Sequence, residues 1–126
     1  MRLTISKDLK EILPSFLVSA YTFDLLEKND KENLSNEISE ALNQIVQEYQ
    51  KNYSLDMVVN IKRIKQTRDG YKKLGKDPSH TRAACEALLR RIIKDGHIYR
   101  LGNVIDVGNL ISLIFLKSCL LYTSPS

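Results

Sequence analysis

Arginine and glutamate side chains recur at helical spacing between residues 82 and 91. Arg82, Glu86 and Arg90 lie four positions apart, and Arg91 follows directly. On a helix, each Arg–Glu pair at this spacing contributes roughly 0.2–0.5 kcal/mol. One interpretation is a solvated helix face, since exposed ion pairs are common and weak. The other is that Arg82, Arg90 and Arg91 bind phosphate or carboxylate groups, which match the paired donors of a guanidinium.

A second polar row, formed by Asn103, Asp106, Asn109 and Ser112, advances in steps of three through an otherwise apolar stretch. Polar side chains on a buried helix need hydrogen-bond partners. We therefore expect a polar network here that includes Glu86, with the neighbouring arginines, Arg90 or Arg91, as candidate partners. A helix cap followed by a plain polar stripe is the alternative, and a ligand pocket at this row is a further one.

The histidines and cysteines lack the spacing of a metal site. His80 and His97 are seventeen residues apart with no carboxylate or thiol at ligand spacing, and Cys85 and Cys119 are isolated. We expect no metal and no cofactor. No nucleophile elbow, phosphate-binding glycine loop or catalytic carboxylate pair is present, so the sequence assigns no catalytic residue.

Composition permits an anionic partner without requiring one. The chain has 126 residues, 43% apolar and 27% charged, with a net charge of +4. Its basic residues concentrate between Lys62 and Arg100, which favours a nucleic-acid partner. No segment has the length and apolarity of a membrane span, and the charged N-terminus lacks a signal-peptide core. With two unpaired cysteines, these features predict a cytoplasmic protein without a membrane partner.

The pattern along the first thirty residues predicts two strands. Leu3–Ile5 is expected as a short strand, followed by a short helix that Ser6 caps and Pro14 closes. Phe16–Leu26 is rich in β-branched and aromatic residues and is expected as a buried strand. Asn29 and Asp30 then mark a turn.

The rest of the chain shows helical periodicity. Apolar residues at helical spacing predict a helix over Lys31–Asn52 and a second from Asp56, as its cap, to Gly75. They predict a third helix over Thr81–Lys94, which Asp95-Gly96 ends. A fourth is expected from Asn103, as its cap, to about Ile114. The expected fold class is α/β with helices dominant.

The order of motifs between about residues 66 and 113 is recognisable. The order begins with Leu74-Gly75, Pro78-Ser79 and the run Glu86–Arg91 (EALLRR). The polar row that starts at Asn103 comes next and reaches to Leu113. This order resembles the B3/B4 domain, which occurs in the beta chain of bacterial phenylalanyl-tRNA synthetase and in free-standing proteins that read LGxxPSxxRxSxEALLRR and INxxVDxxNxxSL. The chain departs from this pattern at Ala83-Ala84-Cys85, where the family has a serine, and in the loop before Asn103.

The resemblance implies a fold and a domain organisation. It implies an α/β (α+β) domain with a mixed sheet, of which residues 1–118 are the helix-rich part, incomplete at its C-terminus. Residues 119–126, CLLYTSPS, are similar to translated sequencing-adapter read-through, and we expect them to be a non-native tail.

The resemblance also implies binding of tRNA or aminoacyl-tRNA, with Arg82, Arg90 and Arg91 as the RNA contacts. In the synthetase this domain hydrolyses tyrosine wrongly attached to the phenylalanine tRNA. One alternative is therefore a trans-editing aminoacyl-tRNA deacylase, an ester hydrolase. Another is a non-enzymatic structural or small-ligand-binding domain in which the polar row only joins helices.

Overall fold

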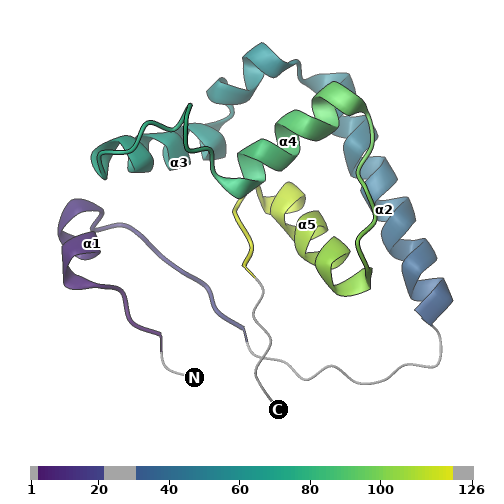
Figure 1. Ribbon diagram of the computed structural model, residues 1–126, viewed down its shortest axis with the longest axis horizontal. Coiled ribbons are helices and arrows are strands. Elements are labelled where there is room, and N and C mark those ends of the chain that lie inside the picture. Colours follow the sequence, from purple (N-terminus) through teal and green to yellow (C-terminus); the bar gives the residue numbers. More distant parts are fainter. Residues whose placement is uncertain (1–2, 22–30, 121–126) are drawn as a thin grey trace.

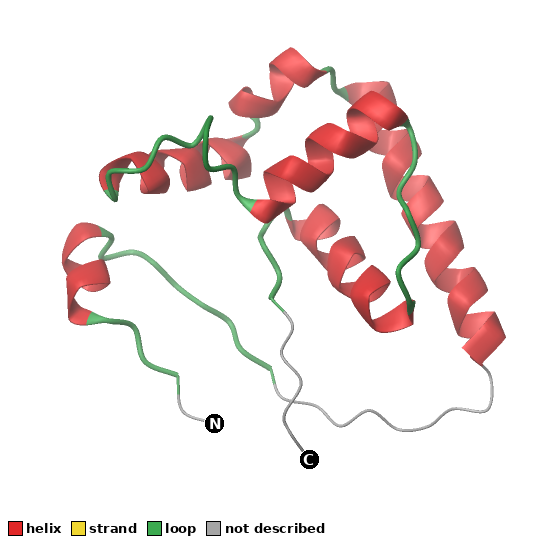
Figure 2. Cartoon of the chain, in the orientation of Figure 1, coloured by secondary structure: helices red, strands yellow, loops and turns green. Residues whose placement is uncertain are grey.

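The computed structural model describes residues 3–21 and 31–120, and every regular element in these ranges is a helix (Figure 1 and Figure 2). In chain order the elements are α1 (Lys7–Ile12), α2 (Lys31–Asn52), the 3₁₀ helix η1 (Leu55–Asn60), α3 (Lys62–Lys73), α4 (Ala84–Asp95) and α5 (Asn103–Phe115).

The predicted α/β fold class with a mixed sheet is wrong for the described residues, because none of them forms a strand. Leu3–Ile5 lies in irregular chain before α1. Residues 16–21 also lack regular structure, and Leu17 and Tyr21 are 88% and 83% exposed. β-Branched and aromatic residues form strands only where a partner strand and a buried face are available. Residues 22–26 of this predicted strand, and the predicted turn at residues 29–30, lie outside the described residues.

The core lies where α2, α4 and α5 pack against one another, with η1 against α3 and α4. Figure 1 shows α5 lying between α4 and α2. Each helix contributes the apolar residues that its periodicity places on one face. The central buried side chains are Val46 of α2, Val58 of η1, Ile64 of α3, Leu89 and Ile92 of α4 and Leu113 of α5.

Two helix predictions are confirmed, and a third predicted helix is two separate helices in the structure. Helix α2 has the predicted bounds, and Ser6 caps α1 by accepting a hydrogen bond from the Leu9 N–H. The helix expected from Asp56 to Gly75 is interrupted at Ile61, whose backbone is extended. On one continuous α-helix, residues 58 and 64 would point about 120° apart. The break allows both Val58 and Ile64 to be fully buried.

The predicted left-handed glycine after α3 is confirmed, since Gly75 has a φ of 81°. Helix α4 begins at Ala84 instead of Thr81. The intervening residues form a turn, in which the Asp77 carboxylate accepts from the Ser79 N–H at 2.9 Å and the Asp77 carbonyl from the Thr81 N–H. This turn carries Ser79 toward α3, where it takes part in the candidate site.

Candidate anion-binding site

The first feature of the site is a buried carboxylate surrounded by arginines. Glu86, on the inner side of α4, is 1% exposed. The Arg68 Nη1 donates to both of its oxygens, at 2.9 and 2.8 Å, and the Arg90 Nε donates to Oε2 at 2.8 Å. Arg82 is a looser partner, with its Nε 3.7 Å from the same oxygen. Three guanidinium groups thus share one negative charge, so the cluster carries a net positive charge.

Different elements supply these arginines. Arg82, Glu86 and Arg90 come from α4 and the residues just before it, at the predicted four-residue spacing. Arg68 comes from α3 and also donates to the Ser79 hydroxyl at 2.8 Å. The cluster therefore joins α3, the turn before α4 and α4 itself. Sequence analysis missed Arg68, because nothing local relates it to a carboxylate eighteen positions later.

The arginines decide the protonation state of Glu86. Burial by itself would raise the pKa of this carboxyl group. Hydrogen bonds from Arg90 and Arg68, together with their charges, outweigh that effect and hold the pKa below its ordinary value. Glu86 is therefore ionised at neutral pH and keeps the guanidinium groups in place.

A shallow hollow of about 550 Å³ opens beside this cluster, along α4 and next to the start of η1. Four cationic side chains and one carboxylate line it, with two apolar residues. The lining residues are Leu55, Arg82, Ala87, Arg90, Arg91, Lys94 and Asp95. We refer to it as the basic hollow. The three arginines singled out from the sequence, Arg82, Arg90 and Arg91, all line it.

The cations of the basic hollow differ in how strongly the protein holds them. Arg90 is anchored through its Nε, and its side chain is 18% exposed. Arg82 is 45% exposed and only loosely paired. The side chains of Arg91 and Lys94 are exposed and make no hydrogen bond or ion pair with another described residue. One anchored cation, one loosely paired cation and two unengaged cations therefore face the same space.

The polar row on α5 forms a separate cluster. Asp106 is fully buried and accepts from the Arg100 Nε at 2.6 Å and from the backbone N–H groups of Leu101 and Gly102 at 2.9 and 3.3 Å. Arg100 also reaches α2, where it donates to the carbonyl and hydroxyl oxygens of Ser35. The arginine that meets Asp106 is therefore Arg100, not Arg90 or Arg91.

The remaining residues of the row make local contacts, within α5 or with Arg100 just before it. Asn103 is the first residue of α5, after the cap at Gly102, and accepts weakly from Arg100 at 3.4 Å. The Ser112 hydroxyl donates to the Gly108 carbonyl one turn earlier, and Asn109 is half-buried. The structure does not bring this row together with Glu86. It ties the start of α5 to α2 and does not line the basic hollow.

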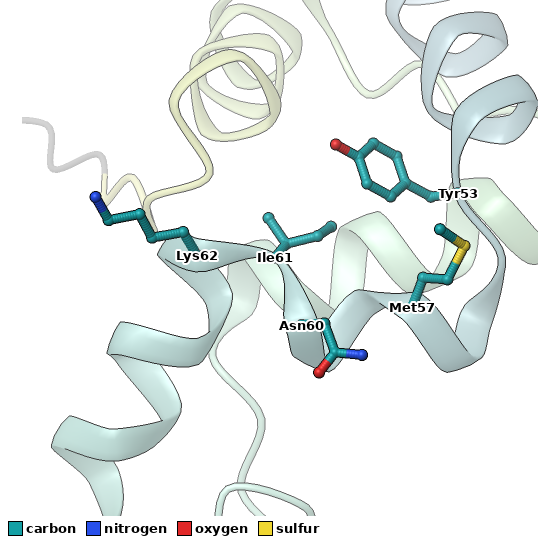
Figure 3. A pocket seen from close by; sticks show the side chains of 5 residues that line it. All are labelled: Tyr53, Met57, Asn60, Ile61 and Lys62. Atoms are coloured by element: carbon teal, nitrogen blue, oxygen red, sulfur yellow. The ribbon is translucent and has the colours of Figure 1, made fainter.

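The second hollow, of about 500 Å³, lies where α2, η1 and α3 follow one another. Figure 3 shows the side chains that line it, which are Tyr53, Met57, Asn60, Ile61 and Lys62. Its surface is mostly apolar. Sequence analysis did not single out any of these residues as a site.

Residues 3–21 and 31–120 hold neither a metal-binding cluster nor a membrane span. No three His, Cys, Asp or Glu side chains in them are grouped so that they could hold a metal ion. No helix in the same ranges is long and apolar enough to cross a membrane. Set beside known proteins, the chain matches no family model, no curated protein and no solved structure.

Proposed function

We propose that the chain binds RNA, with tRNA as the class that the B3/B4 resemblance implies, through the basic hollow. One observation carries the proposal: Arg82, Arg90 and Arg91 line a single hollow together with Lys94. A concentration of cations on one face attracts the phosphate backbone and supplies most of the non-specific affinity for nucleic acid.

The buried Glu86 supports this proposal by holding cations in position. Only the Nε of Arg90 bonds to Glu86, so no described residue accepts from its two terminal amino groups. A guanidinium already held in place loses less conformational entropy when it binds a phosphate. Arg91 and Lys94 add exposed positive charge at the same surface.

Fluorescence anisotropy with labelled tRNA over a salt series tests the proposal. The double variant R91Q/K94Q removes two unengaged cations from the basic hollow and breaks no hydrogen bond between described residues. We expect weaker binding and a shallower salt dependence. The log–log slope should decrease by about one for each phosphate that the variant no longer neutralises.

The matched control is K7Q/K10Q, which removes two exposed charges from α1. It should leave both the affinity and the salt slope close to those of the unaltered chain. Equal losses of affinity in the two double variants would show that net charge alone drives binding. No binding of tRNA at low salt would contradict the proposal and favour a structural or small-ligand-binding domain.

A separate incubation tests the deacylase alternative. Incubation with tRNA mischarged with tyrosine measures the decay of the ester bond. A deacylase must shorten the ester's lifetime relative to buffer, whereas a binding module leaves it unchanged. Binding with an unchanged lifetime is the outcome that the proposal predicts.

A further inference from the structure

An exposed aromatic pair follows the C-terminal end of α4. Residues 96–102 join α4 to α5 (Figure 1). Within this segment Ile98 packs against the core, whereas His97 and Tyr99 on either side of it are exposed. Tyr99 is 67% exposed. The core thus holds the segment at Ile98 and leaves its two aromatic rings at the surface.

Neighbouring groups orient the exposed ring of Tyr99. The ring centroids of His97 and Tyr99 are 4.9 Å apart, and the two rings are nearly perpendicular, at 88°. Such an edge-to-face contact is one of the preferred arrangements of aromatic pairs. Arg100, the next residue, is bonded to Asp106 and Ser35, which fixes the chain directly after Tyr99. The segment therefore presents Tyr99 in a defined orientation.

The aromatic pair is joined to the basic hollow through Asp95. This residue lines the hollow together with Arg91 and Lys94. Its carbonyl oxygen lies 3.2 Å from the His97 Nδ1. A carbonyl oxygen only accepts hydrogen bonds, so Nδ1 is the donor here. A continuous path of contacts thus leads from the lining of the hollow through Asp95 and His97 to Tyr99.

Cations that end at an exposed aromatic ring suit one class of ligand. Proteins that bind single-stranded nucleic acid hold the phosphates with cations and stack the bases on aromatic side chains. A paired base is already stacked on its neighbours, so side chains stack on bases in loops, bulges and strand ends. The Tyr99 hydroxyl makes no hydrogen bond with a described residue, so contact with a base would break none.

We infer that Tyr99 stacks on an unpaired RNA base whose neighbouring phosphates occupy the basic hollow. His97 is a positioning residue for this ring. The inference rests on the proposed function, and it adds that the bound RNA is single-stranded at this point.

Fluorescence anisotropy with a labelled oligouridylate of about 12 nucleotides, over a salt series, tests the inference. Tyr99→Leu keeps an apolar side chain but removes the aromatic face. It should weaken binding by about 5- to 150-fold, the range for the loss of one stacked base. The log–log salt slope should stay unchanged, because Tyr99 neutralises no phosphate. Tyr99→Phe retains the ring and should bind like the unaltered chain.

The matched control is Tyr21→Leu, the same change at a tyrosine that is 83% exposed and lies outside α4 and the segment after it. It should bind oligouridylate like the unaltered chain. A ribose-phosphate oligomer of the same length without bases is the second probe. The unaltered chain and Tyr99→Leu should bind this probe equally, because it has nothing to stack.

The outcomes separate this inference from the proposed function. Equal binding of oligouridylate by the unaltered chain and Tyr99→Leu would overturn the inference and leave RNA binding intact. A decrease in salt slope in Tyr99→Leu, or an equal loss of affinity for the probe without bases, would show an electrostatic or structural effect and would also overturn it. If the unaltered chain binds no RNA at low salt, both proposals fail.

Discussion

Glu86 shows how one buried residue can organise a charged surface. A buried carboxylate loses its hydration, and a single cation compensates this poorly. Here Arg68 and Arg90 both donate to it, and no buried side-chain polar atom among the described residues lacks a partner. Arg90 and, more loosely, Arg82 pair with Glu86, and both also line the basic hollow, where they are partly exposed to solvent. The same interactions thus stabilise the packing of α3 on α4 and orient cations outward.

Replacing Glu86 by Gln should destabilise the fold and change its response to acid. The loss of the carboxylate charge leaves Arg68 and Arg90 without a charged partner, at a cost of about 3–5 kcal/mol in the free energy of unfolding. Because the pKa of Glu86 is lower when folded than its ordinary value of 4.5, its contribution is complete above pH 4.5 and is lost as pH falls through the folded pKa.

Urea unfolding from neutral pH to below the folded pKa of Glu86 measures both effects. The difference in unfolding free energy between the unaltered chain and Glu86→Gln should shrink steadily below pH 4.5. Glu37→Gln, at an exposed position of α2, serves as the control and should leave the profile nearly unchanged. A difference that stays constant with pH would show that the ion pairs do not depend on the charge of Glu86.

At the scale of elements, two helices of this chain end at a glycine, but the surroundings of the two glycines differ. Gly75 and Gly96 both end helices with positive φ, at 81° and 76°. A Cβ at Gly75 would meet no atom within 4 Å, whereas one at Gly96 would lie 2.7 Å from the Gln50 Nε2. That Gln50 amide donates to the Ile93 carbonyl of α4 at 3.4 Å. Only Gly96 therefore combines a conformational requirement with a close neighbour.

Substituting alanine at each glycine separates these two requirements. Gly75→Ala should lower the free energy of unfolding by about 1 kcal/mol, the cost of a left-handed conformation with a Cβ. Gly96→Ala should cost about 1 kcal/mol more, because it also displaces the Gln50 amide from its hydrogen bond. Thermal unfolding measures both values. If Gln50→Ala does not reduce the additional cost of Gly96→Ala, the steric explanation is incorrect.

Long-range hydrogen bonds also complete the end of α5. The Tyr49 hydroxyl donates to the Leu113 carbonyl at 2.6 Å, and the Arg63 Nη1 donates to the Phe115 carbonyl at the same distance. The last carbonyl groups of a helix have no partner within the helix. Residues of α2 and α3 thus supply what no local cap provides, and α5 is held at its C-terminal end as well as along its core face.

At the scale of the whole molecule, residues 3–21 and residues 31–120 differ in how much of their apolar surface they bury. None of the residues of α1 is buried, and Phe16, Leu17 and Val18 are exposed. Among the described residues, the buried ones come from positions 38 to 116. Residues 3–21 therefore contribute little apolar burial to the core.

Deleting residues 1–21 should consequently change the free energy of unfolding by less than about 1 kcal/mol, the scale of a surface change. Urea unfolding of the shortened chain, compared with the full chain at one concentration, measures the difference. Leu42→Ala in the full chain provides a contrast, since removing a fully buried leucine side chain should cost about 2–5 kcal/mol. A decrease of that size on deletion would show that the N-terminal residues belong to the core.

The local architecture of the helices could be predicted from the sequence. The apolar period of 3.6 residues specified α2 to its end residues, and glycine chemistry specified the left-handed end after α3. The four-residue spacing also identified Glu86 with Arg82 and Arg90, because intrahelical neighbours follow directly from helix geometry.

Only the tertiary structure decided which distant groups meet. Periodicity shows which face of a helix is buried, but it does not identify the cation that neutralises a buried carboxylate. Arg68 reaches Glu86 from another helix, and Arg100 links Asp106 to α2. The strand predictions failed for residues 16–21 for a related reason, since a strand depends on a partner segment that no local pattern specifies.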